Sequence, residues 1–274
     1  MGFQTEGAIA ILTGASSGIG WELARLLVQG GASVIAVARR RERLQALRDA
    51  VMTQTSGTAD RPSRGVLTAV EGDITEPEVR QRVIDVAHEI GGGRLDLLIN
   101  NAGIGAIGSF ESATEQRMRR VMEVNFFAPV ELTRLAIPLL KQGQAPVICN
   151  VSSVLGHRAV PDKSEYCASK FALHGWSDAL RAELYPNGIQ VTLVSPSTTR
   201  SEFFDAVIDS APREKRWGLG SWPPDRVARA TLRAIRRRRA EVILSCGGKL
   251  LVYADRVAPP LVNLAVASRR PEHR

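Results

Sequence analysis

Long apolar runs, a secretory leader and paired cysteines are all missing from this sequence of 274 residues. No stretch reaches the roughly 18 uninterrupted apolar residues of a membrane-spanning helix. The opening residues MGFQTE place no basic region ahead of an apolar one, and Glu6 stands where a myristoylation signal requires Ser or Thr. We therefore expect a cytoplasmic protein.

Cysteine is scarce and poorly placed for cross-linking. Cys149, Cys167 and Cys246 are odd in number and far apart. They offer neither a disulfide framework nor metal-ligand spacing. We expect buried, reduced thiols and no metal site.

The sequence does contain a large apolar fraction and a surplus of positive charge. With 44% hydrophobic residues, the chain is long enough for one sizeable domain with a buried core. A net charge of +8 and an isoelectric point near 10.0 predict attraction to anions. Charge alone does not choose among a phosphorylated cofactor, an anionic lipid surface and nucleic acid.

Apolar runs of strand length alternate with helical patterns along the chain. The predicted strands are 8–13, 33–38, 66–70, 95–99, 147–151, 189–194 and 241–244. The predicted helices are 21–29, 76–90, 114–140 (interrupted near Asn125, Pro129 and Pro138) and 225–239, and 53–64 is a surface loop. The alternation predicts an α/β domain, a parallel sheet of about seven strands covered by helices on both faces.

A glycine-rich turn separates the first strand from the first helix. This order places backbone N–H groups at a helix N-terminus, where they bind phosphate. The spacing Gly-x-x-x-Gly-x-Gly differs from the commoner dinucleotide fingerprint, and the Gly-Lys-Ser/Thr ending of a triphosphate loop is missing. A tight turn without a ligand is the competing interpretation. The candidate residues are Gly14, Ser16, Ser17, Gly18, Ile19 and Gly20.

Two arginines follow the second strand. At this place in a dinucleotide fold, an acidic side chain binds a free ribose 2′-hydroxyl, whereas an arginine suits a 2′-phosphate. Arg39 and Arg40 stand here with no Asp or Glu, which predicts NADP(H) over NAD(H). A solvated helix start is the alternative. After the third strand, Asp73 and Ile74 are placed for the adenine, with helix capping by Thr75 or Asp73 as the alternative.

Small and amide residues follow the fourth strand. Asn101, Ala102 and Gly103 let the chain pass close to a flat ring, although a plain turn competes with this interpretation. Asn125 stands among apolar neighbours, where an unpaired amide is costly. We expect it to make structural hydrogen bonds.

The region after the fifth strand contains Ser153, Tyr166 and Lys170. Tyr166 and Lys170 are four residues apart, so on a helix they share a face. A neighbouring cation favours the phenolate and lowers the pKa of a tyrosine from its usual value of about 10. The Ser153 hydroxyl is placed to bind a substrate oxygen. By itself, this spacing more often means a solvated tyrosine beside a surface lysine.

Together these residues give the chain a resemblance to the short-chain dehydrogenase/reductase family over about residues 8–204. The matching motifs are Thr13-Gly14-x-x-x-Gly18-Ile19-Gly20, Asn100-Asn101-Ala102-Gly103, Asn125, Ser153 and Tyr166-x-x-x-Lys170. The resemblance implies a Rossmann-like doubly wound sheet, a homodimer or homotetramer, and reversible hydride transfer between NADP(H) and an alcohol or ketone carbon.

The resemblance also implies roles for individual residues. Tyr166 would be the general acid and base, and Lys170 would lower its pKa and bind the nicotinamide ribose. Ser153 would hold the substrate oxygen, and Asn125 would support a proton-relay water. The family's Pro-Gly after the sixth strand is replaced here by Pro196-Ser197, so the implied carboxamide contact falls on Pro196 and Thr199.

Residues 197–222 correspond to the family's variable substrate lid. They contain the apolar residues Phe203, Phe204, Val207, Ile208, Trp217 and Trp222. We expect an apolar substrate such as a lipid or steroid-like ketone, although packing of the lid on its own body competes. A 3-oxoacyl thioester reductase remains an alternative function. So does a catalytically weak protein that senses NADP(H) or associates with membranes.

The C-terminal part combines arginines with an apolar extension. Arg236 to Arg239 end the predicted helix 225–239 and suit its dipole, so we expect a solvated helix end and no nucleic-acid partner. The extension 249–267 is apolar and broken at Pro259-Pro260. Burial against the protein is the first expectation. A subunit interface and peripheral contact with anionic lipid stay open.

Overall fold

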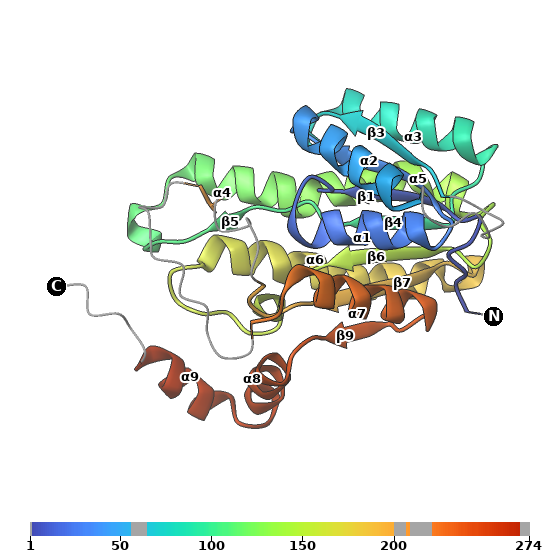
Figure 1. Cartoon of the computed structure of the whole chain (residues 1–274). Helices are drawn as coiled ribbons and strands as arrows, with labels where there is room; N and C mark the ends of the chain where they lie inside the picture. Colours follow the sequence, from blue (N-terminus) through green and yellow to red (C-terminus); the bar gives the residue numbers. More distant parts are fainter. Residues whose placement is uncertain (1, 56–64, 200–206, 209–220, 269–274) are drawn as a thin grey trace.

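A seven-stranded parallel sheet forms the centre of the computed structural model, which describes residues 2–55, 65–199, 207–208 and 221–268 (Figure 1). Its strand order is β3-β2-β1-β4-β6-β7-β9. The strands are β1 (Ile9–Thr13), β2 (Ser33–Ala38), β3 (Leu67–Glu71), β4 (Leu97–Asn100), β6 (Val147–Val151), β7 (Gln190–Ser195) and β9 (Glu241–Ile243). The expected Rossmann-like α/β fold is confirmed.

Helices cover both faces of the sheet. On one face lie α1 (Gly18–Gln29), α2 (Arg41–Thr55) and α7 (Pro224–Arg236); on the other lie α3 (Pro77–Gly91), α5 (Ala128–Leu140) and α6 (Ser164–Leu184). Successive residues of a strand point to opposite faces. Ala10 and Leu12 of β1 therefore join the first layer, and Ile9 and Ile11 join the second. A strand buried on both faces must be apolar throughout.

The chain reverses its direction across the sheet between β1 and β4. From β1 the strands proceed through β2 to β3, and β4 then pairs with the other side of β1. The carboxyl ends of β1 and β4 therefore lie side by side. In open parallel sheets this is the place where ligands bind.

The predicted seven strands all belong to the sheet, with small differences in their ends. A second sheet pairs β5 (Gly105–Ala106) with β8 (Val207–Ile208) and was not predicted. The surface loop predicted from residue 53 begins too early, because α2 continues to Thr55. Residues 56–64 lie outside the described part of the chain.

The long helix predicted over 114–140 is interrupted at Asn125, as expected. It consists of α4 (Glu115–Met122), a π-helical turn at Glu123–Phe127, and α5. Pro129 lies in the first turn of α5, where a missing N–H is tolerated. Pro138 lies inside α5 without ending it.

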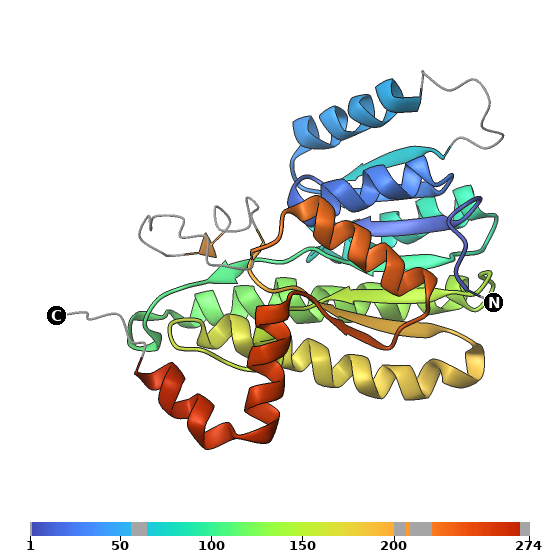
Figure 2. The same ribbon diagram turned by 60° about the horizontal axis from the view of Figure 1, so that its bottom comes forward.

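The C-terminal extension forms α8 (Cys246–Val257) and α9 (Pro259–Ala267), which extend away from the sheet (Figure 2). The expectation that its apolar residues are buried is wrong. Only Gly248 and Val252 of α8 are buried, and no residue of α9 is. Cys246 is also exposed, against the prediction, whereas Cys149 and Cys167 are buried. Within the described ranges, no helix is both long and apolar enough to span a bilayer.

Candidate active site

The glycine turn after β1 is shaped so that only glycine fits at its key positions. Gly14 and Gly18 have φ angles of 69° and 56°, a region that favours glycine. A Cβ at Gly20 would lie 2.1 Å from the carbonyl oxygen of Gly14, and a Cβ at Gly14 would lie 2.8 Å from the Cα of Ala102. The turn therefore packs closely against the loop after β4, with α1 beginning inside it at Gly18.

Asn101 holds this turn in place. Its amide nitrogen donates to the carbonyl oxygens of Thr13 at 3.0 Å and Gly14 at 3.1 Å. The Thr13 hydroxyl accepts from the backbone N–H groups of Asn101 and Ala102, both at 3.0 Å. The side chain of Asn101 is thus used to join β1 and β4, and Ala102 and Gly103 follow it along the same edge.

Arg39 and Arg40 lie at the end of β2 and differ in their contacts. Arg40 donates to the Ser16 hydroxyl from Nη2 at 3.0 Å and from Nε at 3.3 Å, which ties it to the glycine turn. The Arg39 side chain is 60% exposed, and its Nη1 lies 3.9 Å from the Asp73 carboxylate. The Arg40 guanidinium therefore adjoins the glycine turn, whereas that of Arg39 is largely exposed near Asp73.

Asp73 makes structural bonds to Thr75 and Arg120, but the capping alternative is wrong, because α3 has its N-cap at Glu76 without a side-chain cap bond. One carboxylate oxygen accepts from the backbone N–H and hydroxyl of Thr75, and the other accepts from Arg120 at 2.6 Å. Burial opposes its ionisation, but these bonds outweigh burial and lower the pKa of Asp73. The neighbouring Ile74 is buried, and its carbonyl accepts from Arg80. An adenine contact for either residue stays a prediction.

Ser153 and Tyr166 come together at the end of β6. Ser153 is buried, follows β6, and caps a short 3₁₀ turn by accepting from the backbone N–H of Leu155 at 3.1 Å. Tyr166 lies in the first turns of α6; the residue as a whole is partly exposed, but its phenol oxygen is buried. Their two side chains are hydrogen-bonded.

Lys170 lies one turn after Tyr166 and is buried. Its Nζ is 5.8 Å from the centre of the Tyr166 ring and donates to the carbonyl oxygen of Val151 at 3.0 Å. Burial lowers the pKa of Lys170 to about 8. The side chain therefore remains largely cationic at neutral pH.

The expectation that Tyr166 has a lowered pKa is wrong for this structure. Burial raises the pKa of Tyr166 to about 12, and the hydrogen bond with Ser153 only partly opposes this effect. Desolvation of the phenolate dominates this shift, and the Lys170 ammonium, which faces the ring from 5.8 Å, does not reverse it. At neutral pH the phenol keeps its proton.

The loops after β4 and β7 border this group. A Cβ on Gly103 would lie 3.3 Å from Oδ1 of Asn125 and 3.7 Å from Nζ of Lys170, so the loop passes directly beside the lysine. Pro196 accepts from the backbone N–H of Val154, next to Ser153, at 2.9 Å. Thr199 is buried and donates to the Ser197 carbonyl.

Asn125 is fully occupied by structural bonds, as its apolar setting predicted. Its amide nitrogen donates to the Ile104 carbonyl and the Ser169 hydroxyl, both at 3.0 Å. Its oxygen accepts from the backbone N–H of Ile104 at 2.9 Å. The π-helical turn thus connects the β4 loop to α6, and both donors of the Asn125 amide are in use; a part of Asn125 in a proton relay stays a prediction.

A buried ion pair next to Tyr166 was missed by the sequence analysis. Nε of Arg117 donates to the Glu165 carboxylate at 2.8 Å, and these side chains are 2% and 1% exposed. Burial raises the pKa of Glu165, but hydrogen bonds, including that from Arg117, outweigh this effect and lower it. The pair fastens the start of α6 to α4. Because the partners are distant in sequence, no local pattern reveals them.

Three further polar side chains form a chain of hydrogen bonds beneath the site. Asn100 donates to Asn150 and Asn150 donates to Ser177, each at 2.8 Å, which links β4, β6 and α6. In the sequence, an asparagine inside each of the apolar runs of β4 and β6 is the signal from which these buried hydrogen bonds could have been predicted.

Two histidines, His157 and His174, lie together, and His157 directly follows the turn that Ser153 caps. Nε2 of His157 is 2.9 Å from the Ser195 hydroxyl and 3.1 Å from the Glu241 carboxylate, and the rings of His157 and His174 are 4.4 Å apart. Burial, followed by the charges of His174 and Arg256, lowers the pKa of His157 to about 4. No pattern in the sequence indicates that His157, His174 and Glu241 come together. Their possible metal-binding atoms lie within 4.8 Å of one another, which the expectation of no metal site did not foresee.

The residues expected to form the lid are only partly described. Val207 and Ile208 form β8, and Trp222 lies 4.0 Å from the Arg226 guanidinium. Phe203, Phe204 and Trp217 lie outside the described residues.

Comparison with known proteins identifies the family. The sequence pattern of the family described as short chain dehydrogenase matches residues 8–211. The chain belongs to the short-chain dehydrogenase/reductase family. The dehydrogenase/reductase SDR family member 7B of Xenopus laevis is 31% identical over 277 residues, covering 98% of this chain and 83% of that protein.

Two solved structures of this family are similar in fold. A short-chain dehydrogenase from Sphingobium yanoikuyae in complex with NADPH has a TM-score of 0.74 and 27% identity, covering 97% of this chain and 98% of that one. A 3-ketoacyl-(acyl-carrier-protein) reductase from Brucella melitensis complexed with NADH has a TM-score of 0.73 and 26% identity, covering 89% and 98%. The protein is therefore a short-chain dehydrogenase/reductase acting on CH–OH or carbonyl groups with a nicotinamide cofactor.

Proposed function

We propose that this enzyme transfers hydride reversibly between NADP(H) and an alcohol or ketone carbon, with Tyr166 as general acid and base. The observation that carries the proposal is the hydrogen-bonded pair of Ser153 and Tyr166 beside the buried ammonium of Lys170. When bound, the cofactor supplies or accepts the hydride. The protein places the substrate oxygen and moves the proton.

The proton comes from the Tyr166 hydroxyl in the direction of reduction. With a pKa of about 12, the phenol is protonated at neutral pH and can donate to the substrate oxygen. Ser153 would donate a hydrogen bond to the same oxygen. The ammonium of Lys170 would stabilise the phenolate left behind, since the two groups share a partly desolvated site. In oxidation the same groups would act in reverse.

The edge formed by β1, β2 and β4 fits a phosphorylated dinucleotide. The glycines leave no room for side chains, and the backbone N–H groups at the start of α1 favour phosphate. We assign pyrophosphate binding to Gly14, Ser16, Ser17, Gly18, Ile19 and Gly20. Asp73, Ile74, Asn101, Ala102 and Gly103 would border the rings, and Lys170, Pro196 and Thr199 the nicotinamide end. Arg39 and Arg40 would bind a 2′-phosphate.

The substrate is proposed to be an apolar ketone or alcohol. A pocket of about 370 Å³ next to the loop between Ser153 and Tyr166 is lined by Val160, Pro161, Val266 and Ala267, together with Arg158, Ala159 and Asn263. A 3-oxoacyl thioester is the second candidate, favoured by the likeness to the Brucella reductase. The homodimer or homotetramer and the cytoplasmic location stay predictions.

Replacing Tyr166 by Phe tests the catalytic assignment. NADPH consumption would be followed with a panel of steroid-like ketones, aliphatic ketones and 3-oxoacyl thioesters. Loss of a positioned general acid lowers turnover by about a hundredfold to ten-thousandfold. NADPH binding, measured by fluorescence, should remain.

Tyr185→Phe is the matched control, because Tyr185 is 82% exposed and belongs to a short turn after α6. Its turnover should equal that of the wild type. Equal turnover of Tyr166→Phe and wild type would refute the assignment. NADPH binding without turnover of any carbonyl in the panel would favour the sensing alternative.

A further inference from the structure

The helix pair α8–α9 exposes apolar side chains that its own chain does not cover. Of the twelve large hydrophobic side chains exposed in the described residues, five belong to this pair. They are Leu250, Tyr253, Val257, Leu261 and Leu264, with exposed fractions from 52% to 85%. We call these five residues the apolar face. Such a concentration in two short helices marks a contact surface.

The pair is held in position by the body of the protein. Arg158 donates from Nη1 to Asp255 of α8 at 2.9 Å and from Nη2 to Asn263 of α9 at 2.7 Å. Val252 of α8 is buried in a small cluster with Val154 and Ile243. One side of the pair is therefore occupied, which leaves the apolar face directed outward.

The charges on the exposed side are positive. Asp255, the single acidic residue between residues 246 and 268, is turned inward to Arg158. Lys249 and Arg256 are exposed, and Arg256 lies 5.9 Å from the ring of Tyr253. In the sequence, residues 257–268 carry no charge and are followed by Arg269 and Arg270.

We propose that α8–α9 binds an anionic lipid surface through the apolar face, with Lys249 and Arg256 against the headgroups. A helix that lies in a membrane interface combines a buried apolar side with flanking Lys and Arg. A second copy of this chain would meet the apolar face with apolar residues but would bring Lys249 and Arg256 toward like charges. An anionic bilayer offers partners for both kinds of side chain.

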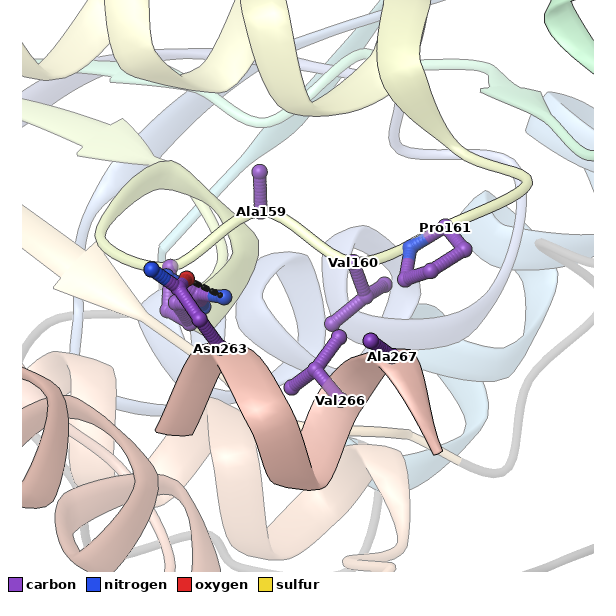
Figure 3. A pocket seen from close by; sticks show the side chains of 7 residues that line it. Ala159, Val160, Pro161, Asn263, Val266 and Ala267 are labelled. Atoms are coloured by element: carbon purple, nitrogen blue, oxygen red, sulfur yellow. Dashed lines mark hydrogen bonds between the residues drawn. The ribbon is translucent and has the colours of Figure 1, made fainter. Parts of the chain in front are cut away.

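If the apolar face lies on a bilayer, the loop of residues 158–161, which belongs to the connection between Ser153 and Tyr166, would also lie close to the lipid. The other side of α9 lines the pocket at residues 158–161, where Val266 and Ala267 face Val160 and Pro161 (Figure 3). That loop connects Ser153 to Tyr166. Delivery of an apolar substrate from the membrane would rest on the proposed function, whereas the binding of lipid does not.

Co-sedimentation of the full chain with vesicles tests the proposal. The vesicles are phosphatidylcholine alone, or equal parts of phosphatidylcholine and phosphatidylglycerol, at low and raised salt. We expect binding to the anionic vesicles that weakens with salt, because screening reduces the attraction between exposed charges. No cofactor or substrate is present, so the result does not depend on catalysis.

Substitutions then locate the contact. Leu261→Asp with Leu264→Asp should weaken binding more than about tenfold, since each leucine contributes roughly 1.5–3 kcal/mol when buried. Arg256→Gln should weaken it by about fivefold, which corresponds to roughly 1 kcal/mol per basic residue near an anionic surface. Phe110→Asp is the control, because Phe110 is 70% exposed on a short turn between β5 and α4 and should not affect binding.

Three outcomes would overturn the proposal. The first is no binding to anionic vesicles at low salt. The second is equal loss of binding in the Phe110 control. The third is a wild type that does not bind vesicles but elutes in gel filtration as a larger species than the variant with Leu261→Asp and Leu264→Asp. The apolar face would then be an interface between copies of the chain. Circular dichroism of each variant verifies that it is folded.

Discussion

At the residue scale, Arg39 and Arg40 perform different tasks although they are neighbours. Arg40 is joined to Ser16 of the glycine turn, so its loss should disturb the turn as well as any ligand. Arg39 is largely exposed, and its neighbour Asp73 is already bonded by Arg120 at 2.6 Å. Arg39 is therefore the cleaner residue with which to test the cofactor preference.

Arg39→Asp should reverse the preference from NADPH toward NADH. An acidic side chain repels a 2′-phosphate and can bind a free 2′-hydroxyl. We expect KM for NADPH to rise by about tenfold or more and KM for NADH to fall, since one charged hydrogen bond contributes roughly 1.5–3 kcal/mol. Steady-state kinetics with both cofactors measures the two values.

Arg41→Asp is the control, because Arg41 is 82% exposed and begins α2. It changes net charge by the same amount, so a general electrostatic effect would appear in both variants. If Arg39→Asp keeps the wild-type preference for NADPH, Arg39 does not bind the 2′-phosphate.

At the element scale, α6 carries both Tyr166 and Lys170, and its position depends on contacts with three other elements. The Arg117–Glu165 pair fastens its start to α4. Ser169 and Ser177 bond to Asn125 and Asn150, which connects the middle of the helix to the π-helical turn and to β6. These bonds determine the position of the Tyr166 phenol relative to the carboxyl ends of the strands.

Glu165→Gln should destabilise the protein strongly. It leaves the Arg117 charge buried without a compensating anion, which typically costs about 3–5 kcal/mol. Urea unfolding followed by circular dichroism measures the free energy of unfolding. The m-value should stay constant, since the same surface is exposed on unfolding.

Glu115→Gln provides the comparison within the same helix α4. Glu115 pairs with Arg119 at 2.6 Å, but these side chains are 70% and 76% exposed. Such a surface pair contributes about 0.3–0.5 kcal/mol. If Glu165→Gln and Glu115→Gln lower the free energy of unfolding by similar amounts, burial does not make the Arg117–Glu165 pair more important for stability than a surface pair.

The sequence predicts the large elements well and the contacts around the site poorly, for physical reasons. Strands such as β1 and β6 are buried on both faces, so they must be apolar runs that can be recognised. The strand β5 has two residues and leaves no periodic pattern. The link between Arg117 and Glu165 depends on the packing of α4 on α6, which no spacing along the chain encodes.

The pKa of Tyr166 illustrates the same limit. Four-residue spacing correctly places Lys170 on the same helix, but the sequence does not reveal how strongly the phenol is buried. That burial reverses the predicted direction of the shift and raises the pKa of Tyr166 to about 12. The prediction for the C-terminal extension errs in the opposite direction. Its apolar composition predicted burial, whereas no residue of α9 is buried.

At the scale of the whole molecule, two imidazoles, those of His157 and His174, lie where the edge strand β9 and the C-terminal extension meet the rest of the protein. His157 follows the Ser153 loop and contacts Ser195 of β7 and Glu241 of β9. His174 of α6, Arg256 of α8 and the Asp178 carboxylate also act on its charge. Protonation of His157 would thus place a cation where β7, β9, α6 and α8 meet.

We expect the fold to lose stability as the pH falls from about 6.5 to about 4. The folded pKa of His157 is about 4, below its ordinary value of 6.5, so in this interval the unfolded chain binds the additional proton. Stability from the neutral ring is complete above the unfolded pKa and is lost as the pH decreases toward the folded value. Asp73 and Glu165 also have lowered pKa values, from 3.8 and 4.5, so their contributions decline mainly at still lower pH.

His157→Gln separates this effect from general acid unfolding. Glutamine keeps a hydrogen-bonding side chain but cannot be protonated in this range. The free energy of unfolding, measured in urea at half-unit steps of pH, should therefore decline less steeply between about 6.5 and 4 in the variant than in the wild type. Parallel curves would mean that His157 has an ordinary pKa in the folded protein, and its burial beside Ser195 and Glu241 would then carry no linkage to folding.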